Sequence, residues 1–251
     1  MPRFAKQFLY GTFYLAILSG ILFGAYQKFL KPAPSCFDTI QNQDEEGIDC
    51  GSVCGNFCLP ADVQPVESVG SVSIFHPIPD RIAVLAQIRN PNSIAATVIP
   101  YHIAFFDEKD APLRVITGET YLAAQETRFI ADFPEGADLA SAVRATIAFD
   151  EPQWVRSADL PRLPVSISQY HPQSDGKQLI VEGIVSNDAT ISASSVTVLV
   201  FFYGTLGQMG GVSKAELSGI GPHETRVFTV QYPLFPGADP SRAQVVVNAR
   251  R

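Results

Sequence analysis

Hydrophobic and polar positions divide the chain into three stretches. Residues 8–26 form an uncharged apolar run of 19 residues, FLYGTFYLAILSGILFGAY. As an α-helix such a run is about 28 Å long, close to the roughly 30 Å hydrocarbon core of a bilayer. A polar segment with all four cysteines follows, and from residue 60 onward short apolar or alternating runs are separated by Pro, Gly, Asn and Asp. The pattern predicts a spanning helix, a small cross-linked neck and a β-rich remainder.

The β-rich remainder divides into runs that predict strands. In the first half these runs are residues 71–75, 81–90, 97–107, 112–122, 126–133 and 142–150. In the second half they are residues 164–168, 177–187, 194–204, 208–220, 224–232 and 243–250. The same number of runs in the same order indicates a repeated unit.

The two halves also match residue by residue, with a period near 97. The matched pairs are His76-Pro77 with His171-Pro172, Asn90 with Asn187, Phe105-Phe106 with Phe201-Phe202, Glu126-Thr127-Arg128 with Glu224-Thr225-Arg226, and Phe133-Pro134 with Phe235-Pro236. A unit of about 90 residues with six or seven short strands is typical of an immunoglobulin-like β-sandwich. We therefore expect a mainly β fold class, with one N-terminal transmembrane helix followed by two tandem immunoglobulin-like β-sandwiches.

These patterns also set the expected boundaries. They are residues 1–31 for the tail and helix, 32–64 for the neck, 65–150 for the first sandwich, 151–163 for a linker and 164–251 for the second sandwich. The linker is proline-rich and lacks strand alternation, so we expect it to be stiff and to fix the orientation of the sandwiches. We expect Trp154, within it, to pack between them, with an exposed binding anchor as the alternative. Each sandwich can bury its own core, so fragments 65–150 and 163–251 should fold separately.

An uncleaved membrane anchor is the preferred interpretation of the apolar run. A cleaved signal peptide usually has a shorter apolar core and a small-residue cleavage site, whereas Lys28 and Lys31 follow this run. A lipoprotein signal is a second alternative, because Ala33, Pro34 and Ser35 precede Cys36, but that cysteine lies ten residues beyond the run. The lipid bilayer is therefore the first expected partner.

Small residues recur every four positions in the apolar run. They are Thr12, Ala16, Gly20 and Gly24. Because they share one face of a helix, they allow a second helix backbone to approach closely. This stripe is the candidate helix–helix interface, for a homo-oligomer or for docking onto another membrane helix, although small residues are also common in spanning helices generally.

Composition and charge narrow the class of partner. With 46% hydrophobic residues the chain has enough apolar side chains for packed cores. From residue 32 onward there are 14 basic and 25 acidic residues, a net charge of −11. Such a surface repels phosphate backbones, so we expect no nucleic-acid partner. Basic residues nearly balance on the two sides of the apolar run, so the positive-inside rule only slightly favours an inside N-terminus.

The cysteines indicate an oxidising compartment. Cys36, Cys50, Cys54 and Cys58 are clustered and even in number, and the rest of the chain contains none. This predicts two disulfides, with three pairings open. A four-thiolate zinc site is the alternative, but paired CxxC knuckles are absent. We therefore expect a single-pass protein of the cytoplasmic membrane whose C-terminal bulk is extracytoplasmic.

The cysteine segment resembles a short motif of bacterial and archaeal surface proteins, C-x-D-x-x-x-N-x-x-E-x-x-x-D-C-G-x-x-C-x-x-C. The matching residues are Cys36, Asp38, Asn42, Glu45, Asp49, Cys50, Gly51 and Cys54, while Cys58 falls one residue late. The resemblance implies an exported location and no activity. Asn42, Asp44, Glu46 and Gly47 mimic half of a calcium loop, but Val53 stands where an EF-hand needs glutamate. We expect the carboxylates to serve solvation and turn formation, with a weaker calcium site as the alternative.

A second resemblance lies in the repeat. Asn90-Pro91-Asn92 after an apolar strand, the run IAFFD at 103–107 and the ETRF turn are similar to FxLYD-type domains of bacterial envelope proteins. They are more distantly similar to the late embryogenesis abundant type 2 sandwich. The second half departs from both, with Asn187-Asp188 and Tyr203-Gly204 at the corresponding places. The resemblance implies a structural or binding module without catalytic residues.

The sequence contains no established catalytic or cofactor motif. GxSxG, HExxH and P-loop patterns are absent, and His76, His102, His171 and His223 are scattered, three of them beside a proline, as is typical of strand ends and turns. We expect no enzyme, no cofactor and no metal. The expected function is a membrane-anchored extracytoplasmic structural or protein-binding module of the bacterial cell envelope, with a protein partner there. The alternative is an accessory subunit of a membrane assembly for secretion, pili or transport. A third class, an enzyme acting on cell-wall glycans, would need two carboxylates facing one cleft, and no acidic pair in the sequence belongs to such a motif.

Overall fold

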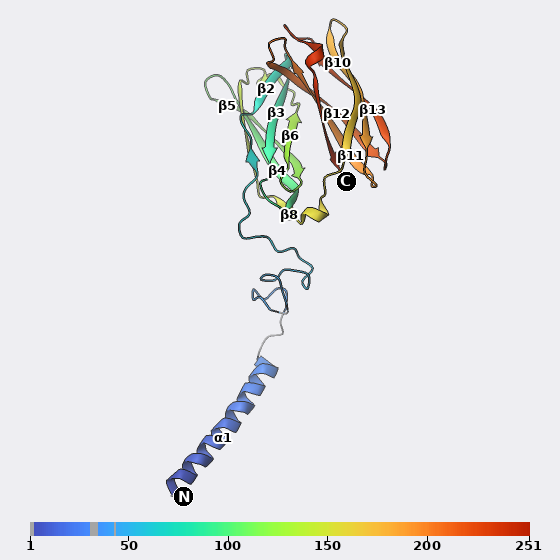
Figure 1. Ribbon diagram of the computed structural model, residues 1–251. Helices are drawn as coiled ribbons and strands as arrows, with labels where there is room; N and C mark the ends of the chain where they lie inside the picture. Colours follow the sequence, from blue (N-terminus) through green and yellow to red (C-terminus); the bar gives the residue numbers. More distant parts are fainter. Residues whose placement is uncertain (1–2, 31–34, 43) are drawn as a thin grey trace. The chain divides into compact units, whose positions relative to one another are not determined.

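The computed structural model describes residues 3–30, 35–42 and 44–251 (Figure 1). Residues 31–34 lie outside the described residues. They include Lys31 and Ala33, which bear on the choice between an anchor and a signal sequence, and the expected boundary between helix and neck. The chain divides into two compact units, Met1–Leu59 and Pro60–Arg251. Each unit is described by itself.

The N-terminal unit begins with a helix longer than the apolar run. Helix α1 spans Arg3–Ala25 and continues as a π-helical turn, η1, over Tyr26–Leu30. Helix α1 buries no residue against the protein. In the described part of the chain, Arg3–Phe29 is the one stretch of helix long and apolar enough to cross a membrane, with a mean hydropathy of 1.7. Length and composition alone fit a signal sequence equally well.

The first sandwich of the second unit consists of two sheets, and in each sheet one edge is formed by two short strands in succession. Its elements are β1 (Glu67–Ser68), β2 (Ser73–Ile78), β3 (Arg81–Arg89), β4 (Ala95–Phe106), β5 (Pro112–Leu122), β6 (Thr127–Asp132), η2 (Ala137–Leu139), β7 (Arg144–Phe149) and β8 (Gln153–Val155). In one sheet β3 is central, with β1 and β2 along one edge and β6 along the other. In the other sheet β4 is central, between β5 and the successive strands β7 and β8.

The same pattern recurs after the short helix η3 (Ser157–Asp159). Its elements are β9 (Val165–Ser174), β10 (Gln178–Asn187), β11 (Ala193–Tyr203), β12 (Met209–Ile220), β13 (Thr225–Pro233), η4 (Pro240–Arg242) and β14 (Gln244–Arg250). The sheets are β9-β10-β13 and β12-β11-β14, and all pairings are antiparallel. Two antiparallel sheets per repeat confirm the predicted fold class, mainly β with tandem sandwiches after an N-terminal helix.

Each sandwich buries its own core. Inward-facing side chains such as Ile103 and Phe105 fill the first, and Val200, Phe202 and Tyr232 fill the second. Alternation along the strands produces this arrangement, since every second side chain points between the sheets.

The beginning of the expected linker is instead a strand. Residues Gln153–Val155 form β8, which pairs with the first residues of β4 and continues the edge that β7 begins. Glu151-Pro152 interrupts the alternation, and a proline is tolerated there because the strand lies at a sheet edge. The expectation for Trp154 is wrong: its side chain packs against Val66, Ile88 and neighbouring residues in the first sandwich.

The two sandwiches pack face to face through an apolar interface that the sequence did not indicate. The outer face of the β2-β3-β6 sheet contributes Phe75, Ala83, Leu85, Phe129, Ala131 and Phe133. The outer face of the β12-β11-β14 sheet contributes Leu199, Phe201, Tyr203, Met209, Val212 and Val246. This explains why β3 buries five successive residues rather than alternate ones. A shared apolar interface, and not only a stiff linker, holds the sandwiches in one orientation.

Candidate functional site

The neck contains the two predicted disulfides. Cys36 pairs with Cys54, and Cys50 pairs with Cys58. In the described part of the chain no cysteine is free. The bonds cross-link a segment with little regular secondary structure, where a hydrophobic core is too small to hold the fold alone.

The neck carboxylates bond to the backbone rather than merely to water. Asp49 accepts the amide protons of Asp38 and Thr39, at 3.0 and 2.8 Å. Asp38 accepts from the Asn42 side chain at 3.0 Å and from the Ser35 amide at 3.1 Å, and these bonds lower the pKa of Asp38. These bonds bear out the turn-forming part of the role expected of the neck carboxylates. The acidic positions of the motif, Asp38, Glu45 and Asp49, are internal hydrogen-bond acceptors.

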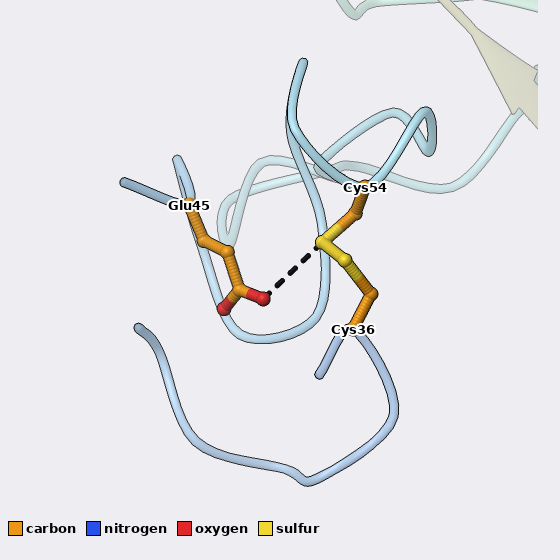
Figure 2. Close-up of side chains that lie close together, drawn as sticks. All are labelled: Cys36, Glu45 and Cys54. Atoms are coloured by element: carbon orange, nitrogen blue, oxygen red, sulfur yellow. Dashed lines mark hydrogen bonds between the residues drawn. A yellow bond between two sulfur atoms is a disulfide. The ribbon is translucent and has the colours of Figure 1, made fainter. Parts of the chain in front are cut away.

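Glu45 is the buried carboxylate of the neck, with 6% of its surface exposed. Its Oε2 accepts the amide protons of Asn42 and Asp49, and its Oε1 points at the Cys54 sulfur, 3.2 Å away (Figure 2). A disulfide sulfur has no proton to donate, so this is a close contact and not a hydrogen bond. Cys36, Glu45 and Cys54 have the proximity of a metal site, yet their sulfurs are not thiolates while the disulfide is intact.

The half calcium loop is used structurally as well. Glu46 Oε1 accepts the Ser52 amide at 3.3 Å. Gly51 has a φ of +114°, and a Cβ there would lie 2.8 Å from the Glu46 nitrogen. Gly47 lies so close to the Cys50 sulfur that a Cβ would come within 2.8 Å of it. The glycines therefore allow the backbone to fold tightly around the disulfides.

The four positions of the small-residue stripe stay on the helix surface. Thr12 Oγ1 donates to the Phe8 carbonyl at 2.7 Å, so its hydroxyl is satisfied within the helix. No atom lies within 4 Å of a Cβ placed at Gly20 or Gly24. Ala16 lies between Thr12 and Gly20 on the same four-residue spacing. The stripe remains a predicted helix–helix interface.

The histidines do not come together. His76 lies in β2 and His171 in β9, so the expectation that they mark strand ends and turns is wrong for both. Their neighbouring prolines are accommodated because β2 and β9 are edge strands. His102 pairs with Asp150 at 2.7 Å, and His223 lies in a turn with a φ of 57°.

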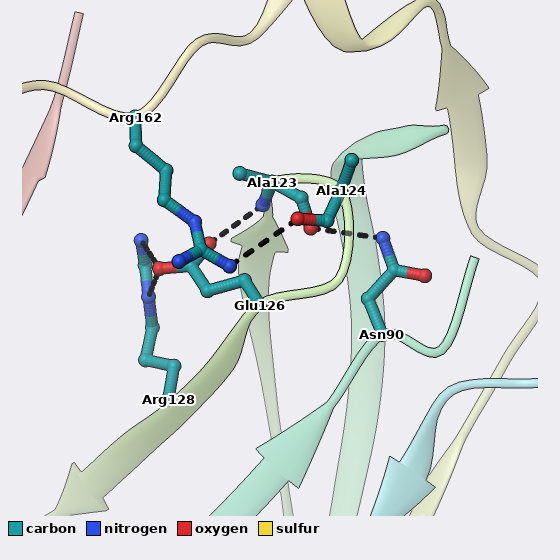
Figure 3. Close-up of polar contacts among 6 residues, drawn as sticks. All are labelled: Asn90, Ala123, Ala124, Glu126, Arg128 and Arg162. Carbon is teal, nitrogen blue, oxygen red and sulfur yellow. Dashed lines mark hydrogen bonds and ion pairs between the residues drawn. The ribbon is translucent and has the colours of Figure 1, made fainter. Parts of the chain in front are cut away.

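A polar cluster recurs at the same place in both sandwiches. In the first, the Asn90 side chain donates to the carbonyls of Ile94 and Ala123, and Glu126 accepts the Ala123 amide at 2.6 Å. Arg128 pairs with Glu126 at 2.8 Å (Figure 3). The cluster of Asn90, Glu126 and Arg128 thus connects two loops at one end of the sandwich.

The second sandwich repeats these bonds with Asn187, Glu224 and Arg226. Asn187 donates to the carbonyls of Ile191 and Ile220, and Glu224 accepts the Gly221 amide at 2.7 Å. The bond from Arg226, together with that amide, lowers the pKa of Glu224.

The two copies differ in burial. The side chains of Arg128 and Glu126 are 7% and 10% exposed, whereas those of Arg226 and Glu224 are 46% and 38% exposed. Arg162, from the segment that connects the sandwiches, donates to the Ala124 carbonyl beside the buried pair (Figure 3). The first copy therefore lies at the junction of the sandwiches, while the second faces solvent.

Two adjoining cavities lie at this junction. The larger, about 270 Å³, is lined by β4, β5 and β6 of the first sandwich and by β11, β12 and β14 of the second. The smaller, about 140 Å³, shares Tyr121, Arg128, Asn248 and Arg250 with it. Sequence reasoning missed this site because its walls come from residues more than a hundred positions apart.

Tyr121 lies between the two cavities. The Arg128 guanidinium lies 3.9 Å from the centre of its ring, and that of Arg250 lies 5.1 Å away. Burial raises the pKa of the Tyr121 phenol, so it stays protonated at neutral pH. At the far side, Tyr101 donates to Asp132 at 2.8 Å, and burial together with that carboxylate raises the Tyr101 pKa. The cavity walls thus offer cations, carboxylates and aromatic rings, an arrangement suited to binding.

Comparison with known proteins adds no inference about this chain. No family model matches the sequence, and no curated protein matches it. Among solved structures, the chain is similar to the crystal structure of red sea bream transglutaminase, with 13% identity and a TM-score of 0.25. The match covers 78% of this chain and 32% of that one, so the chain spans about a third of its length. This similarity carries no inference about activity.

Proposed function

We propose that the protein is a membrane-anchored, extracytoplasmic structural or protein-binding module of the bacterial cell envelope. The observation that carries the proposal is the order of its parts: an exposed apolar helix, a neck closed by two disulfides, and then two sandwiches packed on one another. Disulfides persist in oxidising compartments, which favours a C-terminal bulk outside the cytoplasmic membrane. The resemblances to a surface-protein cysteine motif and to FxLYD-type envelope domains support the same location.

A binding role is favoured over catalysis by the kind of surface available. The cavities at the junction carry ion pairs, tyrosines and exposed arginines rather than a nucleophile held against a base. Sandwich domains also provide rigid edges and faces for partner proteins. The proposed partner is therefore a protein of the envelope, bound by the junction of the sandwiches or by their free edges.

An accessory subunit of a membrane assembly is the alternative, and the stripe of Thr12, Ala16, Gly20 and Gly24 favours it. The helix has no packing partner within the described chain, and the stripe leaves room for a second backbone. The same stripe would equally support a homo-oligomer.

Purification from native membranes in mild detergent tests the proposal. We expect a stoichiometric protein partner to purify with the wild-type chain. Replacing Gly20 and Gly24 by leucine should release a partner held by the helix and retain one held by the sandwiches. Recovery of the chain alone, under conditions that preserve other envelope complexes, would refute the binding function.

A further inference from the structure

Strand β6 has one unpaired edge, and that edge lines the larger cavity. It pairs with β3 alone. Hydrogen bonds from Asn90 to the Glu126 carbonyl and from Ile82 to the Pro134 carbonyl mark both ends of this pairing. Because bonded and non-bonded positions alternate in an antiparallel pair, the backbone groups of Thr127, Phe129 and Ala131 point away from β3.

These groups have no partner within the part of the chain that the structure describes. Five successive β6 residues line the larger cavity, from Arg128 to Asp132. Strand β5 comes near β6 at few positions, whereas β12 follows the equivalent strand β13 closely. An open strand edge beside a cavity is the geometry that accepts an extended peptide as an added strand.

Arginines gather where this groove meets the smaller cavity. The smaller cavity is lined by Arg162, Arg250 and Arg251, in addition to Arg128, which is already paired with Glu126. Residues 60–251 contain 14 basic and 20 acidic residues, so this cluster of arginines is a local positive patch on a unit with a net negative charge. Arg250 has no carboxylate within ion-pair distance among the described residues, and the one hydrogen bond from its guanidinium, to the Thr97 carbonyl, is long at 3.4 Å.

The smaller cavity also has apolar lining residues, beside the polar side chains of Tyr121, Glu126 and Asn248. Its apolar lining consists of Ala123, Leu160, Pro161, Leu163, Val165, Val247 and Ala249. Apolar side chains beside the Arg250 guanidinium, which has no carboxylate partner among the described residues, suit a ligand that carries an aliphatic side chain and a carboxylate on neighbouring atoms, which is the chemistry of a peptide C-terminus.

We propose that the groove binds the extended C-terminal segment of a partner protein, paired antiparallel to β6, with its terminal carboxylate held by Arg250 and its neighbours. In this orientation the peptide C-terminus lies beside Arg128, at the start of β6, where the arginines are. The added strand satisfies the backbone groups of Phe129 and Ala131. The proposal rests on the binding function above and names the chemistry of the partner.

A short peptide tests the proposal on the full chain in lipid nanodiscs. The probe is fluorescein-labelled Thr-Val-Thr-Val with a free C-terminal carboxylate, and binding is followed by fluorescence anisotropy. We expect saturable binding that weakens about tenfold when the carboxylate is amidated, since a charge-assisted bond to Arg is lost. The Arg250→Gln variant should bind the acid about tenfold more weakly and should no longer distinguish it from the amide.

The repeat provides a matched control for the strand pairing. Ala131→Pro removes an amide proton at the free edge of β6 without removing a bond to β3, and should abolish binding. Thr229→Pro makes the equivalent change at the free edge of β13 and should leave binding unchanged. Loss of binding in both variants would mean that proline acts by unfolding. The comparison of the acid and amidated peptides on the wild-type protein would then test the proposal, because it leaves the protein unaltered.

Three results would overturn the proposal. They are the absence of saturable binding, equal binding of acid and amide, and full displacement of the peptide by inorganic phosphate at the peptide's own affinity. The last would show a simple anion site. None of them bears on whether a partner purifies with the chain from native membranes, so the failure of this inference and of the proposed function can be told apart.

Discussion

Phe201 and Phe202 are adjacent in the chain and point in opposite directions, which makes them a direct test of the interface between the sandwiches. Phe201 is 2% exposed and packs edge-on against Phe129 of the first sandwich, with 5.0 Å between ring centres. Phe202 is 1% exposed and stacks on Tyr232 inside the second sandwich. The two alanine variants therefore remove the same side chain from two different places.

Both substitutions should cost about 3–5 kcal/mol of unfolding free energy, because each leaves a cavity the size of an aromatic ring. The two substitutions lower the stability of different parts of the protein. In Phe201→Ala the lost contacts are those that couple the sandwiches, so each sandwich should stay folded while cooperation between them falls. In Phe202→Ala the second sandwich itself is destabilised, including an aromatic contact worth about 0.5–1.5 kcal/mol.

Trp154 makes the distinction measurable. It is the one tryptophan of the chain, and it packs within the first sandwich. In urea titrations of the full chain in nanodiscs, tryptophan fluorescence reports the first sandwich and β-type circular dichroism reports both. Wild type should show coincident transitions, and Phe201→Ala should separate them without lowering the β signal in native buffer. Coincident transitions in Phe201→Ala, with less than about 1 kcal/mol lost, would refute the reasoning about the interface.

Three further predictions follow from the contacts. Arg128→Ala should cost about 3–5 kcal/mol because it leaves the Glu126 carboxylate buried and unpaired, whereas Arg226→Ala should cost much less because that pair is exposed to solvent; equal losses in thermal melts would contradict the burial of the first pair. Unreduced, denatured protein should show no free thiol in a colorimetric assay, whereas four thiols released by a chelator would establish zinc instead. Burial raises the pKa of Tyr232 to about 12, so its contribution to stability is complete below pH 10 and is lost as the pH rises toward 12; phenolate absorbance of the native protein rising fully near pH 10 would contradict this.

Much of the fold could be predicted from the sequence, because alternation and turn residues act locally. The strands, their order and the helix follow from patterns within a few residues of one another, and the repeat follows from comparing the two halves. The matched Phe pairs show the limit. Phe105 points into the core of the first sandwich, but it is the second residue of the later pair, Phe202, that points into the core of the second. A one-residue shift in alignment exchanges the two faces of a strand, and identity of letters cannot reveal it.

The interface and the cavities could not be predicted for a related reason. Leu199 and Phe201 alternate with core residues, so their strand reads as a continuous apolar run, typical of burial on both faces, but the run does not say what covers the second face. The short β8 was missed because a proline precedes it and it has only three residues. Separate folding of the two halves stays a prediction, and the first fragment should extend at least to Val155, since β8 pairs with β4.

The neck shows the opposite case, in which the motif and a turn-forming role for its carboxylates were predicted, but the individual partners of those carboxylates were not. The spacing of Asp38, Glu45 and Asp49 was clear in the sequence, but acidic residues in a turn-rich segment ordinarily face water. Which amide protons they accept depends on the path of the chain around Cys36–Cys54 and Cys50–Cys58. Several pairings of the four cysteines satisfy the spacing equally well, so the pairing required the structure.

Membrane anchoring with the sandwiches outside the cytoplasm is the central claim, and protease treatment of intact spheroplasts tests it most directly. Cells should carry the full chain with an epitope after Arg251, and a cytoplasmic protein should serve as the control for intact membranes. The account predicts that added protease removes the epitope and the two sandwiches while the control protein stays whole. Full protection of the epitope until the membrane is dissolved by detergent would contradict the account.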